Sequence, residues 1–121
     1  MLFVASNNLV GEVKMKIGYL AYPYRSDPQG NTMKVRRLAL RLMKRHPTLF
    51  LIVPHFTVDN LLEGSKFHER AIDYCLALVE KADLLILGTK KLSEGMQVER
   101  GYAHKKRKQV KYATELLRGK K

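Results

Sequence analysis

The chain has 121 residues, of which 45% are hydrophobic and 28% are charged, with 8 glycines and 4 prolines. This is the size and composition of one globular domain, and it excludes collagen-like, low-complexity and fully disordered proteins. A single cysteine, Cys75, excludes an intramolecular disulfide, a multi-cysteine zinc site and a CxxC redox pair. The formal charge is +12, from 23 Lys and Arg against 11 Asp and Glu, so we expect a surface that attracts nucleic acid, nucleotide or phosphate.

The first strong strand pattern begins only at Lys16. We therefore interpret residues 1–14 as a peripheral extension and residues 15–121 as one domain. The extension is too short and too lightly charged for a signal peptide, and no apolar run approaches the ~18 residues of a membrane span. These features favour a cytoplasmic protein.

Short apolar runs alternate with longer amphipathic segments along the chain. The apolar runs predict strands at 16–21, 49–53, 84–88 and 109–114, the second of them buried on both faces. The amphipathic segments predict helices at 31–45, 67–81 and 93–106, with a helical turn at 58–62 and a basic tail at 116–121. This order predicts an α/β fold, a doubly wound parallel sheet of four to five strands in a flavodoxin-like or Rossmann-like three-layer sandwich.

In sheets of this type, ligands bind in the crevice at the carboxyl ends of the strands. The predicted topology brings three polar loops to this edge, at residues 22–31, 54–66 and 88–95. We therefore expect a functional site to be built from these three loops.

The third loop and the helix after it carry the most informative residues. Ser93 stands at the expected N-cap, where its hydroxyl and the free backbone amides would form an anion site. Gly95 has no side chain, so a ligand can approach the backbone closely. Glu99 lies one helical turn further along the same face, which would place a carboxylate beside the anion site.

Positive charge surrounds Glu99 in the sequence, at Lys90, Lys91 and Arg100. These cations are expected to keep the carboxylate ionised, which suits a nucleophile better than an acid. The alternative interpretation is structural. In that case Ser93 is only a helix cap, and Glu99 is a solvated residue near the positive end of the helix dipole.

Short motifs follow one another along the chain in a recognisable order. The first strand is followed by Pro-Tyr-Arg (23–25) and the second by Pro-His (54–55). A helix then ends in Ala-Asp (82–83) before an apolar strand and a glycine, and the last motif is Ser-Glu-Gly-Met-x-x-Glu-x-x-x-Ala (93–103). This order resembles the nucleoside 2-deoxyribosyltransferase-like superfamily, in particular its small, largely uncharacterised bacterial and phage members. The resemblance covers residues 16–114.

The resemblance implies a five-stranded flavodoxin-like fold, commonly dimeric or larger, that binds nucleosides or nucleoside monophosphates. It implies an N-glycosidase or deoxyribosyltransferase in which Glu99 attacks the anomeric carbon. Ser93 and the amides near Gly95 and Met96 would hold the 5′ end of the nucleoside or its phosphate. The residues of the first loop that would line the sugar and phosphate site are Tyr22, Pro23, Tyr24 and Arg25.

Two positions depart from the pattern of the family. Tyr22 stands where active members carry a glycine before the proline, and its bulk would narrow the site or stack on a base. Cys75 stands eight residues before Asp83, where active members carry an Asp that orients the substrate and handles the proton of the base. Asp73 is a poor substitute, because on a helix it points about 200° away from position 75. The alternative function is therefore a non-catalytic nucleotide-binding module on the same fold.

Other polar residues of the loops have a functional and a structural interpretation. His55 follows the second strand, where it can act as a general acid or contact a base, or be structural. Arg25 can clamp a phosphate with two nitrogen donors or remain solvated. Asp59 and Asn60 can bind sugar hydroxyls, although a turn is the plainer interpretation. Tyr19 is expected in the core or in a subunit contact.

The second helix is expected to turn Phe67, Tyr74 and Cys75 inward, with Cys75 acting as a small apolar residue. No group of His, Cys and Asp has the spacing of metal ligands. We therefore expect no metal, and nothing in the sequence indicates a cofactor.

Basic residues gather towards the end of the chain, in residues 104–108, at Lys111 and in residues 118–121. One interpretation is a nucleic-acid surface, which makes a basic nucleic-acid-associated protein a second alternative function. The other is the solvated end of a helix, where cations suit the dipole. The stretches lack interleaved aromatic residues for stacking on single strands, so non-specific nucleic-acid binding is all that they predict.

Overall fold

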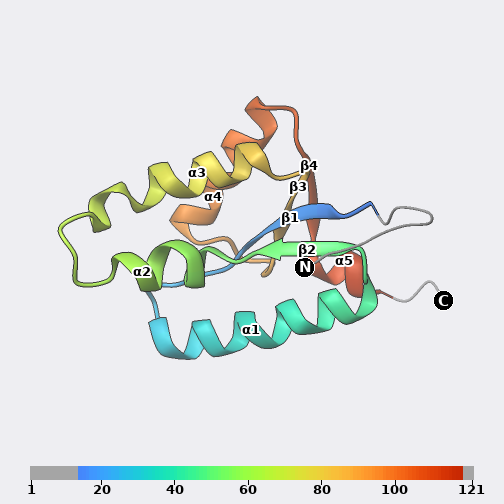
Figure 1. Ribbon diagram of the computed structural model, residues 1–121, viewed down its shortest axis with the longest axis horizontal. Helices are drawn as coiled ribbons and strands as arrows, with labels where there is room; N and C mark the ends of the chain where they lie inside the picture. The colour runs from blue at the N-terminus through green and yellow to red at the C-terminus, as the bar shows by residue number, and fades with distance from the viewer. Residues whose placement is uncertain (1–13, 119–121) are drawn as a thin grey trace.

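The computed structural model describes residues 14–118, so the predicted extension lies outside the described residues except for Lys14. Strands and helices alternate along the chain (Figure 1). The strands are β1 (Lys16–Ala21), β2 (Leu49–Ile52), β3 (Leu84–Leu87) and β4 (Gln109–Tyr112). The helices are α1 (Pro28–Arg45), α2 (Asn60–Leu62), α3 (Ala71–Lys81), α4 (Glu94–Lys105) and α5 (Ala113–Leu117). A π-helical turn (His55–Asp59) precedes α2, and a 3-10 turn (His68–Arg70) precedes α3.

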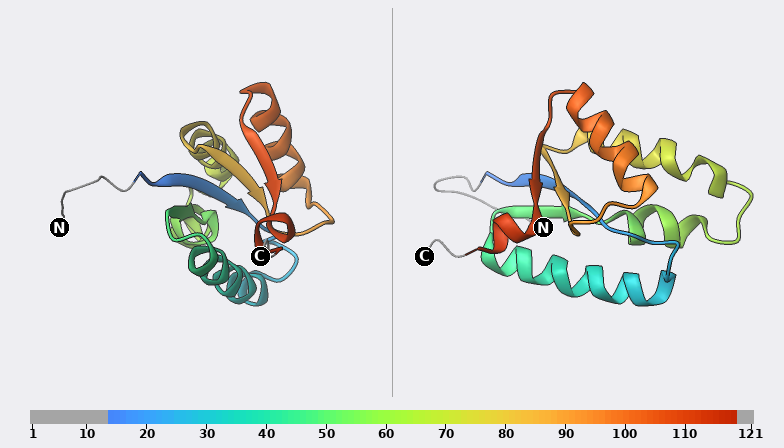
Figure 2. Two further views of the ribbon diagram at one scale, coloured as in Figure 1. Left: turned by 90° about the vertical axis from the view of Figure 1, so that its right-hand side faces the viewer. Right: turned by 180° about the vertical axis from the view of Figure 1, so that it is seen from behind.

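The four strands form one parallel sheet in the order β2-β1-β3-β4. Helices α3 and α4 cover one face of the sheet, and α1 and α5 cover the other (Figures 1 and 2). This confirms the predicted doubly wound three-layer fold, with four strands. Because β1 pairs with β2 on one side and with β3 on the other, the strand order reverses at β1. The crevice expected for ligands therefore lies between the carboxyl ends of β1 and β3.

Successive side chains of each strand point to opposite faces of the sheet, so a separate core forms on each face. Tyr19, Ala21, Leu85 and Leu87 pack with buried residues of α3 and α4. The intervening residues, Leu20, Leu84 and Ile86, pack with buried residues of α1 and with Ala113 of α5. Both faces of β3 are covered, and all four of its side chains are buried. This explains why its sequence is continuously apolar.

The first helix begins three residues earlier than the sequence pattern predicts. Asp27 is its N-cap, and the Asp27 carboxylate accepts a hydrogen bond from the Gly30 amide at 3.2 Å. Pro28 occupies the first helical position, which a proline fits because its fixed φ is already helical and that position needs no N–H donor. The predicted caps, Asn31 and Thr32, lie inside the first turns, where Asn31 is buried.

Three predictions of burial are wrong. Phe50 of β2 is 54% exposed because β2 is an edge strand, so one of its faces lacks the cover that a central strand has. Phe67 and Tyr74 are 41% and 39% exposed. Phe67 precedes the regular part of α3, and Tyr74 lies on its outer side. Cys75, in contrast, is buried as predicted.

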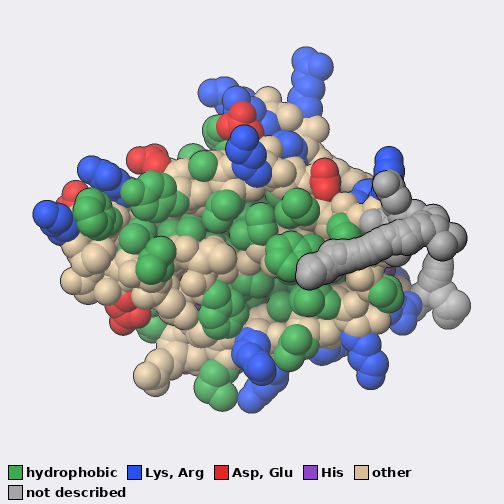
Figure 3. All heavy atoms as spheres, viewed as in Figure 1, with side chains coloured by type: hydrophobic (Ala, Val, Ile, Leu, Met, Phe, Trp, Pro, Cys, Tyr) green, Lys and Arg blue, Asp and Glu red, His purple; other side chains and the backbone are tan. Residues whose placement is uncertain are grey.

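Apolar side chains gather on the face of the molecule that shows β2 and α2 (Figure 3). The large hydrophobic residues of the molecule that are exposed include Met15, Met33, Leu40, Phe50, Phe56 and Leu61. No helix in residues 14–118 is long and apolar enough to cross a membrane.

The last predicted strand is shorter than expected. It ends at Tyr112, and residues 113–117 form α5, where a strand end and a basic tail were predicted. The Glu115 carboxylate accepts a hydrogen bond from the Tyr112 amide at 2.7 Å and so caps the new helix. Ala113 then packs into the core beside α1.

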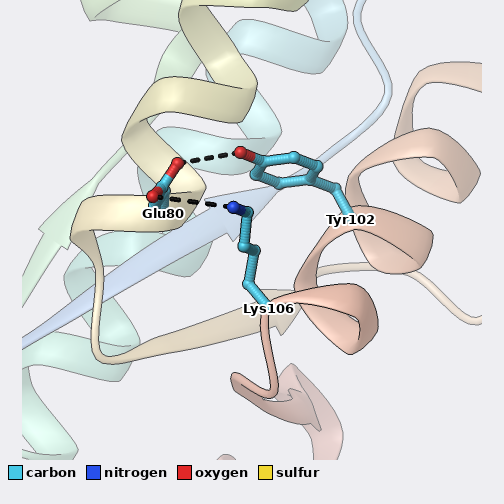
Figure 4. Close-up of polar contacts among 3 residues, drawn as sticks. All are labelled: Glu80, Tyr102 and Lys106. Atoms are coloured by element: carbon cyan, nitrogen blue, oxygen red, sulfur yellow. Dashed lines mark hydrogen bonds and ion pairs between the residues drawn. The ribbon is translucent and has the colours of Figure 1, made fainter.

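A polar contact ties α4 to α3 (Figure 4). The Tyr102 hydroxyl donates a hydrogen bond to Glu80 at 2.8 Å, and Lys106 Nζ lies 3.8 Å from the other oxygen of the same carboxylate. An exposed pair of this kind contributes little to the free energy of unfolding. The contact joins the two helices at the surface, and Glu99 lies one turn before Tyr102 on α4.

Candidate active site

Two polar side chains meet inside the core on the α3 and α4 side of the sheet. Tyr19, in the middle of β1, is fully buried, and its hydroxyl donates a hydrogen bond to Glu99 Oε2. Glu99 is 6% exposed and lies between Met96 and Ala103 on the inward stripe of α4. That stripe has helical spacing, so the pattern which packs α4 on the sheet also carries a carboxylate inward.

The buried carboxyl of Glu99 is held partly protonated at neutral pH. Its pKa is about 7, because burial raises it strongly, the hydrogen bond from Tyr19 lowers it by stabilising the carboxylate, and the negative charge of Asp59 raises it. The prediction that Lys90, Lys91 and Arg100 keep Glu99 ionised is wrong. All three cations are exposed on the loop or on the outer side of α4, and none of them affects the pKa of Glu99. The prediction that Glu99 is a solvated helix residue is wrong as well.

Asp59 is a second carboxylate of the site, at the end of the turn that follows β2. Burial raises the pKa of Asp59, and the electrostatic interactions of Asp59 with His55 and Arg25 counteract the rise. The charge of Asp59 in turn raises the pKa values of Glu99 and Cys75. Asp59 lies in a turn, as the sequence favoured, and its effect on Glu99 makes it a candidate site residue. The sequence signal was its place in the polar loop 54–66, which already allowed Asp59 a binding role.

Cys75 lies beside Tyr19 on the α3 side of the site. Burial raises the pKa of the Cys75 thiol to about 12, so it is neutral and unreactive at physiological pH. Burial and the charge of Glu99 also raise the pKa of Tyr19 well above its ordinary value, so that Tyr19 is a permanent hydrogen-bond donor. The sequence identified Tyr19 only as a core or contact residue. A buried tyrosine hydroxyl needs a polar partner, and this requirement was the signal for its role.

His55 is completely buried at the start of the turn after β2. Its Nε2 donates a hydrogen bond to the Pro23 carbonyl at 2.8 Å, and its Nδ1 has no partner within residues 14–118. Burial lowers the pKa of His55, so the ring is neutral at pH 7 and poorly suited to act as a general acid. His55 instead joins the exit of β1 to the exit of β2.

The aromatic residues of the first loop divide between the two faces of the sheet. The Tyr24 ring lies 5.4 Å from the His55 ring, and its hydroxyl donates to Glu63 at 3.0 Å. The Tyr22 ring lies 6.1 Å from His55 but packs with Leu38 and the α1 and α5 core. The structure therefore keeps Tyr24 near the carboxylates and turns Tyr22 away from them.

Gly88, directly after β3, makes room for the position of Tyr22. A side chain on Gly88 would place its Cβ 2.5 Å from the Tyr22 ring and 2.9 Å from the Ala21 carbonyl oxygen. The Gly88 amide donates to that same carbonyl at 2.8 Å.

Arg25 of the first loop is exposed, and its positive charge lowers the pKa of Asp59.

The start of α4 is arranged as a helix cap. The Ser93 hydroxyl accepts a hydrogen bond from the Met96 amide at 3.2 Å, so this amide is already paired. The Met96 side chain is buried against the sheet. Gly95 is exposed, and nothing within 4 Å would meet a side chain there. Of the predicted phosphate cradle, the Met96 amide and the Ser93 hydroxyl are engaged with each other in the cap, while the approach to the backbone at Gly95 is open.

Asp83 of the Ala-Asp motif has a structural role. Its carboxylate accepts a hydrogen bond from the Ile17 amide at 2.7 Å, and its amide donates to the Ile17 carbonyl at the same distance. Both bonds extend the pairing of β1 with β3. Within residues 14–118, no group of three His, Cys, Asp or Glu side chains could hold a metal ion.

A protein-family model described as a domain of unknown function, DUF7768, matches residues 16–113. The match runs from the first residue of β1 to the first residue of α5 and contains every site residue described above. No curated protein sequence matches the chain.

Proposed function

The chain belongs to the DUF7768 family, and we propose that its site binds a nucleoside or nucleoside monophosphate and breaks the N-glycosidic bond. One observation carries the proposal: the Glu99 carboxyl is buried, holds a hydrogen bond from Tyr19 and has a pKa of about 7. Buried carboxyls with displaced pKa values are typical of active sites, because a catalytic group needs a pKa that is matched to its task. The resemblance to the nucleoside 2-deoxyribosyltransferase-like superfamily supplies the reaction class.

In the proposed reaction, a carboxylate oxygen of Glu99 attacks the anomeric carbon C1′ of the sugar. A bond forms between this oxygen and C1′, the bond from C1′ to the base nitrogen breaks, and the electron pair leaves with the base. The base takes up one proton, and water then hydrolyses the glycosyl ester to release the sugar and restore the carboxylate. An acceptor base in place of water would give transfer.

Asp59 is the proposed proton donor to the leaving base. The position at which related enzymes carry an aspartate is Cys75 here, and its neutral thiol with a pKa of about 12 is a poor donor. Burial raises the pKa of Asp59, so a proton is held there more readily than on a solvated carboxyl. The carboxyl comes from the turn after β2, so two different elements supply the acid and the nucleophile.

The proposal is tested by incubating the protein with ribo- and deoxyribonucleoside monophosphates and measuring released base by chromatography. We expect release by the wild type and a loss of at least about 1,000-fold in the Glu99→Gln variant, because an amide oxygen is a far weaker nucleophile. Binding of the monophosphate, measured by calorimetry, should persist in the variant. Binding without release by the wild type would contradict catalysis and favour a nucleotide-binding module.

Replacing Asp59 by asparagine distinguishes the proposed role of Asp59 as the acid from that of Glu99 as the nucleophile. We expect base release to fall by about 100-fold or more, because a general acid typically contributes that much. The acidic limb of the pH profile should also move to lower pH, since removing the charge of Asp59 lowers the pKa of Glu99. Initial rates between pH 5 and pH 9 measure both effects.

Asp73→Asn is the matched control, because Asp73 is an exposed carboxylate of α3 and has no effect on the pKa of Glu99. Its rates should follow the wild type at each pH. An Asp59→Asn variant with an unchanged rate and an unshifted limb would remove Asp59 from the proposed mechanism.

A further inference from the structure

A strongly basic groove lies on the opposite face of the sheet from Glu99. Helices α1 and α5 enclose this open groove of about 610 Å³, which reaches the carboxyl ends of β1 and β3 at Tyr22 and Gly88. Its lining contains four cations, Lys34, Arg37, Arg41 and Arg118, and no Asp or Glu. We call it the α1–α5 groove.

The four cations of the α1–α5 groove have no neutralising partner in the described part of the chain. The single ion pair of residues 14–118 joins Lys106 to Glu80, on the α3 and α4 side. Concentrated charge of one sign in a concave, partly apolar surface focuses the field and attracts polyanions. A fold of this size needs no such cluster for its stability, because like charges repel one another.

Helical spacing aligns the cations into a row. Lys34, Arg37 and Arg41 are separated by three and four residues, so they share one stripe of α1. The stripe is about 10 Å long at 1.5 Å per residue. Arginine binds phosphate through two parallel N–H donors, so a row of this kind follows a phosphodiester chain better than it fits one small anion.

The second wall of the groove is held rigidly against the first. His46, just after α1, has its Nε2 2.7 Å from the Leu116 carbonyl oxygen, and Arg45 donates to the Arg118 carbonyl at 3.2 Å. These two bonds fix the end of α5 on α1. They place Arg118 and Leu117 opposite the row of cations, so the groove is present without a ligand.

The floor of the groove is apolar and has an aromatic residue at one end. Leu38, Leu117 and the half-buried ring of Tyr22 pack against the core there. Proteins that bind single strands combine a basic groove along the backbone with aromatic rings on which bases stack. A duplex hides its bases and is too wide to enter between two helices.

From these features we propose that the α1–α5 groove binds single-stranded nucleic acid, with phosphates on the row of cations and a base on Tyr22. The row belongs to α1. Of the basic stretches identified in the sequence, residues 104–108 lie on the other side of the sheet, whereas Arg118 lines the groove. The proposal does not depend on the activity proposed for Glu99, because the two sites lie on opposite faces.

The test is a fluorescence anisotropy titration of a labelled 20-nucleotide single strand over a range of KCl concentrations. Four phosphate contacts predict a slope of about −3 for log K against log salt. The Arg37→Gln, Arg41→Gln double variant should bind at least about tenfold more weakly at 0.1 M salt and show about half the slope. Arg37→Lys with Arg41→Lys should keep the slope but lose affinity, because the charge remains and the two-donor geometry is lost.

The matched control is the Lys66→Gln, Lys105→Gln double variant, which loses the same charge from exposed positions outside the groove. Its slope should equal that of the wild type. Tyr22→Leu should weaken single-strand binding by about tenfold and leave heparin binding unchanged, because heparin has no bases to stack. Thermal melting of each variant verifies that it is folded.

Four results would overturn the proposal. A 20-base-pair duplex that binds as tightly as the single strand would indicate backbone attraction alone. An equal loss of affinity in the control variant would indicate a diffuse effect of net charge. If a nucleoside monophosphate displaced the labelled single strand, the binding would have to be assigned to the Glu99 site. Equal competition by vesicles containing phosphatidylserine would make the groove a general anion surface.

Discussion

Glu99→Gln is expected to stabilise the protein at pH 8 and to leave its stability nearly unchanged at pH 4. The carboxyl of Glu99 has an ordinary pKa of 4.5, and burial raises this to about 7 in the folded protein. Between these values the folded state holds a proton that the unfolded state has released. The free energy of unfolding therefore falls as pH rises through this window.

The size of the effect follows from the displacement of the pKa. A rise from 4.5 to about 7 corresponds to a loss of roughly 3 kcal/mol by pH 8, at about 1.4 kcal/mol for each pH unit. Glutamine is neutral at every pH and can still accept the hydrogen bond of Tyr19, so the variant avoids this loss. The melting temperature should rise by roughly 10 °C at pH 8, as measured by calorimetry.

Glu94→Gln is the matched control, because Glu94 is an exposed glutamate on the same helix. Its effect should stay within about 0.5 kcal/mol at both pH values. Equal melting temperatures for the wild type and Glu99→Gln at pH 8 would show that the carboxylate is solvated or paired in solution. Such a result would also weaken the proposed catalytic role, since a site residue often costs stability.

Tyr19→Phe should move the pH profile of base release to higher pH. The reaction needs ionised Glu99, so the ionisation of Glu99, with a pKa of about 7, should shape the acidic limb of the profile, while protonated Asp59 shapes the basic limb. The Tyr19 hydroxyl stabilises the carboxylate and lowers that pKa. Its removal raises the pKa by about one to two units, because a hydrogen bond to a charged group contributes about 1.5–3 kcal/mol.

The expected loss for Tyr19→Phe, relative to the wild type, is therefore about 5- to 50-fold at pH 7 and should shrink as pH rises towards 9, where Glu99 is ionised in both proteins. Initial rates of base release from pH 5 to pH 10 measure both. A purely structural role for Tyr19 would lower the rate equally at every pH. If Glu99 acted as a general acid, Tyr19→Phe would instead raise the rate relative to the wild type above pH 7, because more Glu99 would stay protonated.

Tyr102→Phe is the control for this experiment. Tyr102 lies on α4 and also donates its hydroxyl to a glutamate, Glu80, but this pair is on the surface. Its loss should leave the pH profile of base release in place. The comparison isolates burial as the reason for the effect of the Tyr19 hydroxyl.

The order of elements and the class of fold were determined by the sequence alone. Continuous apolar runs at β2 and β3 and helical spacing in α1, α3 and α4 predict a parallel sheet covered on both faces. The same patterns predict where a site must lie, since the carboxyl ends of parallel strands meet at one edge. These features depend on local periodicity, which is written in consecutive residues.

The environment of each site residue was decided only by the tertiary structure. The sequence places cations next to Glu99, but helix α4 turns them outward. Folding then brings Tyr19 and Asp59 to Glu99 from distant segments of the chain. The sequence also places Tyr22 close to Tyr24, but Tyr22 packs with the α1 and α5 core, whereas Tyr24 contacts His55 and Glu63 from the segment after β2. A pKa, a hydrogen bond and a groove depend on which segments meet across the sheet, and proximity along the chain does not determine that.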